Sequence, residues 1–314
     1  MVTTETRPEQ ATTPRTLDEV PGWFWPIDQQ LFGWLLDQQS ESGLRGDLLE
    51  LGSYLGRSAI VMGAHLRPGE SFTVCDLFDS EAPDGENAAE MAMSYRKTLT
   101  RSAFERNYLA FHSELPTIVQ APTSVLGDGR ISPGSCRFVH IDASHLYEHV
   151  AVDIRTAKAA LGPGGIVVLD DFRSQHTPGV AAAAWEAVFR LGLRPVCVTP
   201  EKLYGVWGDP EPLQSALIEL GGDVADCYLD VDVVAGRQLV RLSGRGVAKL
   251  MPEAERAPWA DSESEPGGEQ PSAPRAPQPA PAPRPGPSAA RRLAKDLLPP
   301  VAVRALRKLR AGDH

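Results

Sequence analysis

The sequence lacks long hydrophobic runs, closely spaced cysteines and an excess of basic residues. Because no stretch of about 18 apolar residues occurs in its 314 residues, no transmembrane helix is expected. The N-terminus, MVTTETRPEQATTPR, has no apolar segment, so no secretory signal peptide is expected. The four cysteines form no Cys-x-x-Cys pair, which argues against a disulfide framework or a thiolate metal site. Together these absences predict a soluble, cytoplasmic protein.

The charge of the chain is acidic and unevenly distributed. A formal net charge of -10 argues against general nucleic-acid binding. Residues 288–314, however, hold seven Lys or Arg against two Asp. This segment is expected to be a basic, amphipathic tail that either docks on a membrane surface or a protein partner, or stays solvated. A homo-oligomer is also compatible with the sequence.

Composition divides the chain into four parts. Residues 1–17 are polar and rich in Thr, Pro and Glu, which predicts a disordered N-terminus. Residues 18–250 have ordinary globular composition and are expected to form one domain. Residues 251–287 predict a disordered linker, since nine of the 22 residues from Pro266 to Pro287 are proline. The basic tail, 288–314, follows this linker.

The domain alternates between apolar strand-like runs and helical patterns. GDLLELG, SFTVCDLF, PTIVQAP, CRFVHID and GGIVVLDDF predict five strands separated by helices, a pattern typical of a parallel sheet covered on both faces. RPVCVT and KLYGVWG are joined by only a few residues and therefore predict an antiparallel hairpin. The predicted fold is α/β, with a doubly wound, mostly parallel seven-stranded sheet that ends in this hairpin. Residues 211–245 are expected to add a helix and further strand-like pieces.

Aromatic residues gather in PGWFWPIDQQLFGWLLDQQ, where the spacing from Ile27 onward predicts an amphipathic helix. The tryptophans there either pack in the core or form a wall or lid over a ligand pocket.

The first strand-to-helix turn is ELGSYLGRS, from Glu50 to Ser58. It has neither the G-x-G-x-x-G spacing of dinucleotide-binding turns nor the Gly-Lys-Ser/Thr of a phosphate-binding loop. Its two glycines let the backbone approach a ligand closely, and an acidic residue stands beside them. The turn therefore suits a ligand that carries an amine and a ribose. The candidate binding residues are Glu50, Gly52, Ser53, Gly56 and Ser58.

Asp76 ends the second strand. A carboxylate at this position can accept hydrogen bonds from both hydroxyls of a ribose, or it can simply cap the strand. The glycine turn upstream favours ribose binding.

The stretch LLELGSYLGRSAIVMGAHLRPGESFTVCDLF resembles the first two motifs of class I S-adenosylmethionine-dependent methyltransferases. The closer similarity is to metal-dependent O-methyltransferases of the catechol O-methyltransferase kind and to macrolide-sugar O-methyltransferases, over about residues 45–190. The resemblance implies a Rossmann-like methyltransferase fold in which the Gly52 turn holds the methionine part of S-adenosylmethionine and Asp76 its ribose. It also implies that Gln120 and Ala121 edge the adenine.

Two further strands end in carboxylates. Asp142 follows the fourth strand, and Asp170 and Asp171 follow the fifth. Neighbouring parallel strands end at the same edge, so these side chains are expected to converge, and a divalent cation would relieve their repulsion. Oxygen ligands favour Mg²⁺, with Mn²⁺ or Ca²⁺ as further candidates and helix capping as the alternative role of the aspartates. Asp170 and Asp171 match the acidic pair of the resembled families. Catechol-type enzymes have Asp-Asn at these two positions.

His145 follows Asp142 by three residues and is the candidate catalytic base. An imidazole of ordinary pKa, about 6.5, can take a proton near neutral pH. His140 is expected in the core, and His149 lies one turn farther from the edge. In the resembled families, a metal-binding Asp is followed three residues on by the residue that deprotonates the acceptor hydroxyl. That residue is Lys in catechol-type members and His in macrolide-sugar members, and the resemblance therefore implies the same role for His145.

The predicted function is a Mg²⁺-dependent transfer of a methyl group from S-adenosylmethionine to a hydroxyl of a small molecule or sugar, such as a secondary metabolite or a glycan. A catechol is the next choice of acceptor. Two alternatives stay open: a metal-independent or N-directed methyltransferase, and a non-catalytic cofactor-binding scaffold recruited by its basic tail.

Overall fold

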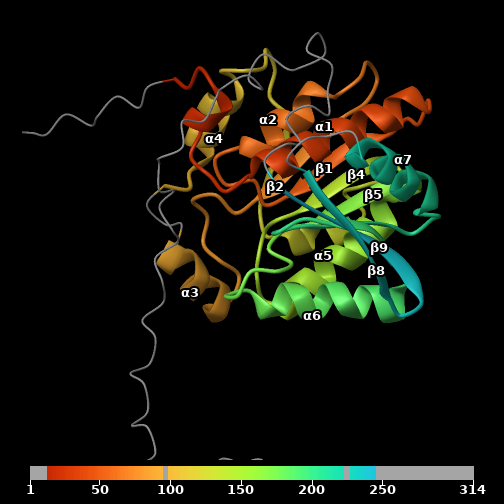
Figure 1. Cartoon of the computed structure of the whole chain (residues 1–314). Helices are drawn as coiled ribbons and strands as arrows, with labels where there is room; N and C mark the ends of the chain where they lie inside the picture. Colours follow the sequence, from red (N-terminus) through yellow and green to blue (C-terminus); the bar gives the residue numbers. More distant parts are fainter. Residues whose placement is uncertain (1–12, 95–97, 223–226, 245–314) are drawn as a thin grey trace, which may run out of the picture. The chain divides into compact units, whose positions relative to one another are not determined.

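A nine-stranded sheet forms the centre of the computed structural model (Figure 1). The structure describes residues 13–94, 98–222 and 227–244, which all belong to one unit, Met1–Pro266. The strand order is β3-β2-β1-β4-β5-β7-β6-β9-β8. The strands are β1 (Asp47–Leu51), β2 (Phe72–Asp76), β3 (Thr117–Gln120), β4 (Cys136–Ile141), β5 (Leu161–Leu169), β6 (Arg194–Val198), β7 (Leu203–Val206), β8 (Cys227–Val234) and β9 (Arg237–Gly244).

The pairing of the strands confirms the predicted α/β class and adds to it. Strands β1 to β5 are parallel, whereas β7 runs antiparallel to both β5 and β6. The predicted β6–β7 hairpin is thus present, but β7 lies between β5 and β6. Strand β9 pairs parallel to β6 and antiparallel to β8, so two strands extend the sheet beyond the seven expected. Asp230 and Asp232 on the edge strand β8 pair with Arg241, and such charges disfavour pairing with another sheet.

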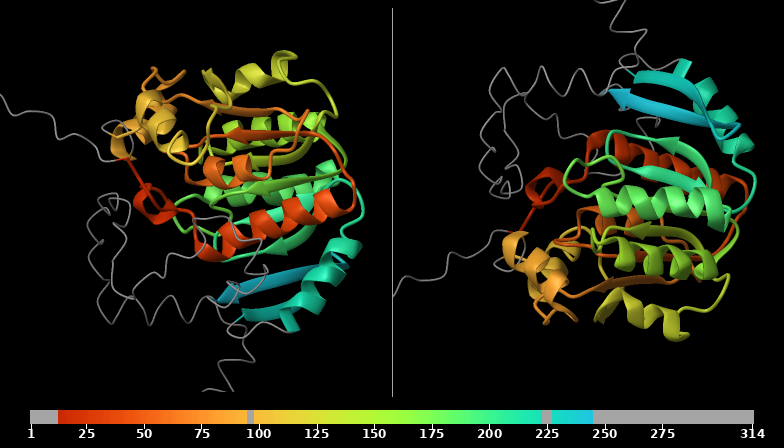
Figure 2. Two further views of the ribbon diagram at one scale, coloured as in Figure 1. Left: turned by 90° about the horizontal axis from the view of Figure 1, so that it is seen from above. Right: turned by 90° about the horizontal axis from the view of Figure 1, so that it is seen from below.

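Helices cover both faces of the sheet, α1 and α2 on one face and α5 and α6 on the other (Figures 1 and 2). Successive strand residues alternate between the two layers, as the period of a strand requires: Leu48 packs with the α1–α2 layer and Leu49 with the α5–α6 layer. The helices are α1 (Pro26–Glu41), α2 (Arg57–Ala64), α3 (Gly85–Ser94), α4 (Arg101–Tyr108), α5 (Tyr147–Ala160), α6 (Pro178–Glu186) and α7 (Glu211–Gly222).

The aromatic cluster before α1 is divided between core and surface. Phe24 and Trp34 are buried, but Trp23 and Trp25 are 39% and 43% exposed. Trp23 lies against Tyr54 of the glycine turn, with ring centroids 5.4 Å apart. Core packing therefore accounts for only part of the cluster.

Some predictions lie outside the described residues. These include the first 12 residues of the predicted disordered N-terminus, the Pro-rich linker 251–287 and the basic tail 288–314. Among the described helices, none combines the length and hydropathy needed to cross a membrane.

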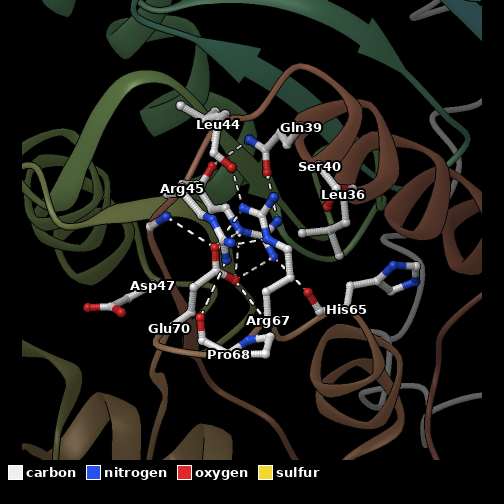
Figure 3. Close-up of polar contacts among 12 residues, drawn as sticks. Leu36, Gln39, Ser40, Leu44, Arg45, Asp47, His65, Arg67, Pro68 and Glu70 are labelled. Carbon is white, nitrogen blue, oxygen red and sulfur yellow. Dashed lines mark hydrogen bonds and ion pairs between the residues drawn. The ribbon is translucent and has the colours of Figure 1, made fainter.

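A buried charge cluster ties together the strand ends opposite the predicted ligand edge. Glu70, before β2, binds Arg67 at 2.6 Å (Figure 3). It also binds Arg137 of β4 at 3.0 Å, and the Arg137 side chain is fully buried. Burial alone would raise the pKa of Glu70, but hydrogen bonds from both arginines lower it to about 2. Gln39 of α1 also accepts a hydrogen bond from Arg137. The cluster therefore fixes α1, β2 and β4 to one another.

Replacing Glu70 by glutamine is expected to destabilise the protein by about 3 kcal/mol at pH 7, because a buried arginine loses its counter-charge. Since folding lowers the pKa of Glu70, its contribution is present above its ordinary pKa of 4.5 and is lost as the pH falls toward 2. Urea unfolding at pH 7 and at pH 3 measures both effects. The partly exposed Arg101–Glu105 pair is the control, and Glu105→Gln should cost no more than about 0.5 kcal/mol. Equal losses for the two variants would contradict the role of the cluster.

Candidate active site

The glycine turn between β1 and α2 packs directly against the end of β4. Gly52 has φ +80°, and a Cβ added there would lie 2.1 Å from the Asp142 carbonyl oxygen. Gly56, the N-cap of α2, has φ +97°, and a Cβ added there would lie 3.1 Å from the ring of Phe104. Only glycine fits the first position, because both the backbone angle and the space exclude a side chain. The turn therefore brings the first strand end against the predicted metal-binding strand end.

Glu50 lies below this turn and is fully buried. Its Oε1 lies 2.9 Å from Nδ1 of His140, and burial raises its pKa to about 8 despite a hydrogen bond from Ser58. Its Oε2 has no hydrogen-bond partner among the described residues. A buried acceptor without a partner is costly, and an amine or water brought by a ligand would satisfy it.

Asp76 holds the glycine turn in shape. Its carboxylate accepts hydrogen bonds from the backbone N–H groups of Ser53 at 2.7 Å, Tyr54 at 3.1 Å and Phe78 at 2.8 Å. Asp76, which was predicted to bind the ribose, thus lies beside the turn predicted to bind the methionine part. Its carboxylate oxygens, however, already accept hydrogen bonds from backbone N–H groups. These contacts correspond to the capping role that the sequence left open as the alternative to ribose binding.

Gln120 and Ala121, the residues predicted to edge the adenine, lie beside the end of β2. Gln120 pairs in register with Asp76, and the backbone N–H of Ala121 donates to the Asp76 carbonyl at 3.1 Å. The Gln120 side chain donates to Asp79 at 2.9 Å.

The three predicted metal-binding carboxylates belong to two different groups of possible ligands. We call His140, Asp142 and Asp170 the inner group, and Asp142, His145 and Asp171 the outer group. Within each group the candidate ligand atoms all lie within 4.8 Å of one another. Asp142 is common to both, and burial together with the charges of Asp170 and Asp171 raises its pKa well above the ordinary value. The edge is therefore acidic and crowded, as expected, but its two aspartates after β5 point to different partners.

Lys202, directly before β7, reaches the inner group. Its side chain is 1% exposed, and its ammonium donates to Asp170 and lies 3.3 Å from Nε2 of His140. Burial lowers the pKa of Lys202, but the charges of Asp170, Asp142 and Asp28 raise it above its ordinary value. The ammonium therefore stays charged and neutralises part of the acidic edge.

The outer group places the predicted base next to a carboxylate. Nε2 of His145 lies 2.9 Å from Oδ2 of Asp171, and the Ser174 hydroxyl lies 2.7 Å from Asp171 Oδ1. Burial would raise the pKa of Asp171, but His145 and Ser174 lower it to about 2. Asp171 therefore stays ionised near neutral pH and can orient the imidazole.

Backbone strain gathers at the same edge. Tyr54, Phe78 and Asp171 have positive φ angles of 49°, 49° and 54°, and they follow β1, β2 and β5. Among the described residues only Ala235, in the β8–β9 turn, shares this conformation without being glycine. Strained residues at three strand ends are typical of a functional site.

The other two histidines of this stretch do not belong to the outer group. His140 is fully buried in the sheet, as expected, and burial lowers its pKa well below the ordinary value. His149 lies 3.1 Å from Asp84 and is partly exposed.

Two residues of the site were not found from the sequence. Lys202 follows the short β6–β7 connection, and because Leu203 pairs with Leu169, it stands opposite Asp170. Asp28 of α1 is fully buried and accepts hydrogen bonds from Thr199 and Tyr204. The only signal in the sequence was a lysine directly before an apolar strand. This signal does not show which neighbouring strand β7 pairs with, and therefore which residues Lys202 faces.

Comparison with known proteins agrees with this geometry. Residues 49–172 match the family model described as "Methyltransferase domain", a span that holds every predicted site residue and ends before Lys202. No curated protein matches the chain in sequence.

Similar solved structures include the O-methyltransferase NovP, at 19% identity, covering 57% of this chain and 78% of that one, with a TM-score of 0.45. An O-methyltransferase from Bacillus cereus, in complex with SAH, is 15% identical, with coverages of 60% and 85% and a TM-score of 0.41. The TDP-rhamnose 3'-O-methyltransferase CalS11 is 20% identical, with coverages of 58% and 80% and a TM-score of 0.38. Likenesses this distant say nothing about the acceptor.

The family match rests on the same residues as the geometry. It begins in β1, just before the glycine turn, and ends at Phe172, just after the two aspartates that follow β5. It agrees with the methyltransferase resemblance of the sequence motifs. Residues 49–172 of this chain therefore match a methyltransferase domain.

Proposed function

We propose that this protein transfers a methyl group from S-adenosylmethionine to a hydroxyl oxygen, and that the outer group activates this hydroxyl. The observation that carries the proposal is the convergence of Asp142, His145 and Asp171 beside the glycine turn of a methyltransferase domain. A carboxylate–imidazole pair next to the cofactor turn is suited to removing a proton from an oxygen.

The residues around the turn fit S-adenosylmethionine. The unpartnered Oε2 of Glu50 suits an amine, and the bare backbone at Gly52 and Gly56 permits close approach. Ser53 and Ser58 would complete the site for the methionine part. Asp76 would bind the ribose, and Gln120 and Ala121 would contact the adenine. Bound there, the cofactor supplies an electrophilic methyl group on a sulfonium.

His145 is the proposed base, and Asp171 positions it. In the tautomer whose Nε2–H donates to Asp171, Nδ1 is the nitrogen that takes the proton from the acceptor. The ionised Asp171 also stabilises the imidazolium that results. Together they turn a weak nucleophile, a neutral hydroxyl, into an alkoxide-like one.

A divalent cation is part of the proposal, held by Asp142 and Asp171. The carboxylate oxygens of these two residues are the kind of ligand that suits Mg²⁺ or Mn²⁺. A cation there would lower the pKa of a bound hydroxyl. Asp170 is less suited to the cation than the sequence predicts, because Lys202 already binds it. The acceptor that fits is a small molecule or a sugar with neighbouring hydroxyls, and a cytoplasmic location stays a prediction of the sequence.

One observation favours a second candidate function, a metal-independent methyltransferase. Lys202 already supplies a positive charge at the acidic edge, so the carboxylates do not all require a cation. In that case the His145–Asp171 pair alone would activate the acceptor.

Calorimetric titration with MnCl₂ decides between the two. The metal-dependent proposal expects one bound ion in the unaltered protein and binding at least about tenfold weaker in Asp171→Asn, which loses a ligand charge. Asp84→Asn is the control, since Asp84 is an exposed carboxylate that pairs with His149 outside the outer group. An unaltered protein that binds no Mn²⁺ would remove the metal and leave the second candidate.

A further inference from the structure

The inner group contains a cation supplied by the chain itself. The ammonium of Lys202 contacts two of its three members, Asp170 and His140. The third member, Asp142, is close enough to interact with it electrostatically. Like those of the outer group, the ligand atoms of these three side chains converge tightly enough to hold a metal ion.

The surroundings of Lys202 suit a fixed ammonium. Its Nζ lies 5.3 Å from the ring centroid of Phe24 and 6.0 Å from that of Phe32, so two aromatic faces stabilise the charge. Asp28, which is fully buried, adds a further negative charge nearby. A lysine enclosed on several sides has little freedom to leave, unlike a bound ion, which exchanges with solvent.

The contacts also give the direction of each hydrogen bond. Lys202 has only donors, so Nε2 of His140 accepts from it, and Nδ1–H of His140 donates to Glu50. A continuous buried chain of contacts therefore runs from the glycine turn through His140 and Lys202 to Asp170.

We propose that Lys202 is a positioning residue that takes the place of a metal ion in the inner group. It holds Asp170 and His140 in fixed positions and leaves the outer group as the part of the edge that receives the acceptor. Asp170 thereby helps to hold the site in shape, whereas Asp171 belongs to the outer group, which activates the acceptor. The inference rests on the proposed function for the role of the outer group, whereas the counter-ion role is measured without turnover.

The test replaces Lys202 by methionine, which has a similar shape and no charge. We expect Lys202→Met to bind one more Mn²⁺ than the unaltered protein in a titration with MnCl₂, because the inner group has lost its own cation. Its melting temperature should fall by on the order of 10 °C without metal and rise again with MnCl₂. Lys158→Met is the matched control, since Lys158 is exposed and donates to a backbone carbonyl, and it should change neither quantity.

A double variant keeps the proposal testable if Lys202→Met folds poorly. In Lys202→Met/Asp170→Asn both charges are gone, so stability should recover toward that of the unaltered protein and the additional Mn²⁺ should not bind. The proposal is wrong if Lys202→Met folds but binds no additional Mn²⁺, or if the double variant is no more stable than the single one. A gain of one Mn²⁺ in a protein that shows no methyl transfer would uphold this inference and reject the proposed function.

Discussion

Replacing His145 by alanine is expected to lower the rate of methyl transfer by about 10²–10⁴-fold, the usual contribution of a general base. The imidazole lies 2.9 Å from Asp171 and belongs to the outer group, where the acceptor hydroxyl is proposed to bind. The affinity for S-adenosylmethionine should not change, because the residues proposed to bind it lie in the glycine turn and at the ends of β2 and β3. Single-turnover rates and calorimetric cofactor titrations measure the two quantities separately.

His149→Ala is the matched control for this variant. His149 lies one turn farther along α5, pairs with Asp84 and is outside the outer group, so its loss should change the rate by less than about threefold. Titration with MnCl₂ then separates two roles of His145. A base leaves the metal affinity of His145→Ala unchanged, whereas a metal ligand lowers it. Undiminished turnover in His145→Ala would remove the base assignment.

Replacing Gly52 by alanine is expected to weaken S-adenosylmethionine binding by about 10²-fold or more. The new Cβ would lie 2.1 Å from the Asp142 carbonyl oxygen, so the turn or the end of β4 must move, and misplacement by about 1 Å has effects of this size. The rate of methyl transfer should fall as well, because Asp142 belongs to the outer group. Cofactor calorimetry and thermal unfolding measure the losses.

Gly43→Ala is a control that separates the effect of an unfavourable backbone angle from the effect of a steric clash. Gly43 has φ +75°, close to the +80° of Gly52, but no described atom lies within 4 Å of its added Cβ. This control should cost only about 1–2 kcal/mol of stability and leave cofactor binding intact. If Gly52→Ala behaves like Gly43→Ala, close packing at the turn is not what cofactor binding requires.

Local sequence patterns were sufficient to predict the strand ends of the site. Residues Glu50, Asp76 and Asp142 close apolar runs, and parallel strands deliver such residues to one edge whatever their order. The glycine turn could be predicted for the same reason, since its glycines satisfy a local backbone requirement.

Pairing between strands distant in the sequence could not be predicted in this way. The hairpin of β6 and β7 was expected. Lys202 comes to lie opposite Asp170, however, only because β7 also pairs antiparallel with β5. Asp28 likewise reaches the site through the packing of α1 on the sheet. Such contacts depend on tertiary arrangement, which short motifs do not record.

The division of the aspartate pair has a backbone cause. Asp170 continues the strand and bonds to the β4 carbonyl of Ile141, whereas Asp171 has φ +54° and turns the chain toward His145. Adjacent residues at a strand end therefore serve different partners. The sequence shows two neighbouring carboxylates but not this left-handed residue.

The most direct test of the central claim is mass spectrometry of products formed from S-adenosylmethionine and a panel of sugars and catechols with neighbouring hydroxyls. The account predicts a product with one added methyl group on oxygen, formed at a rate that EDTA lowers and Mg²⁺ or Mn²⁺ restores. Both His145→Ala and Asp171→Asn should lose this product. Methylation confined to nitrogen, or O-methylation that neither variant diminishes, would contradict the account.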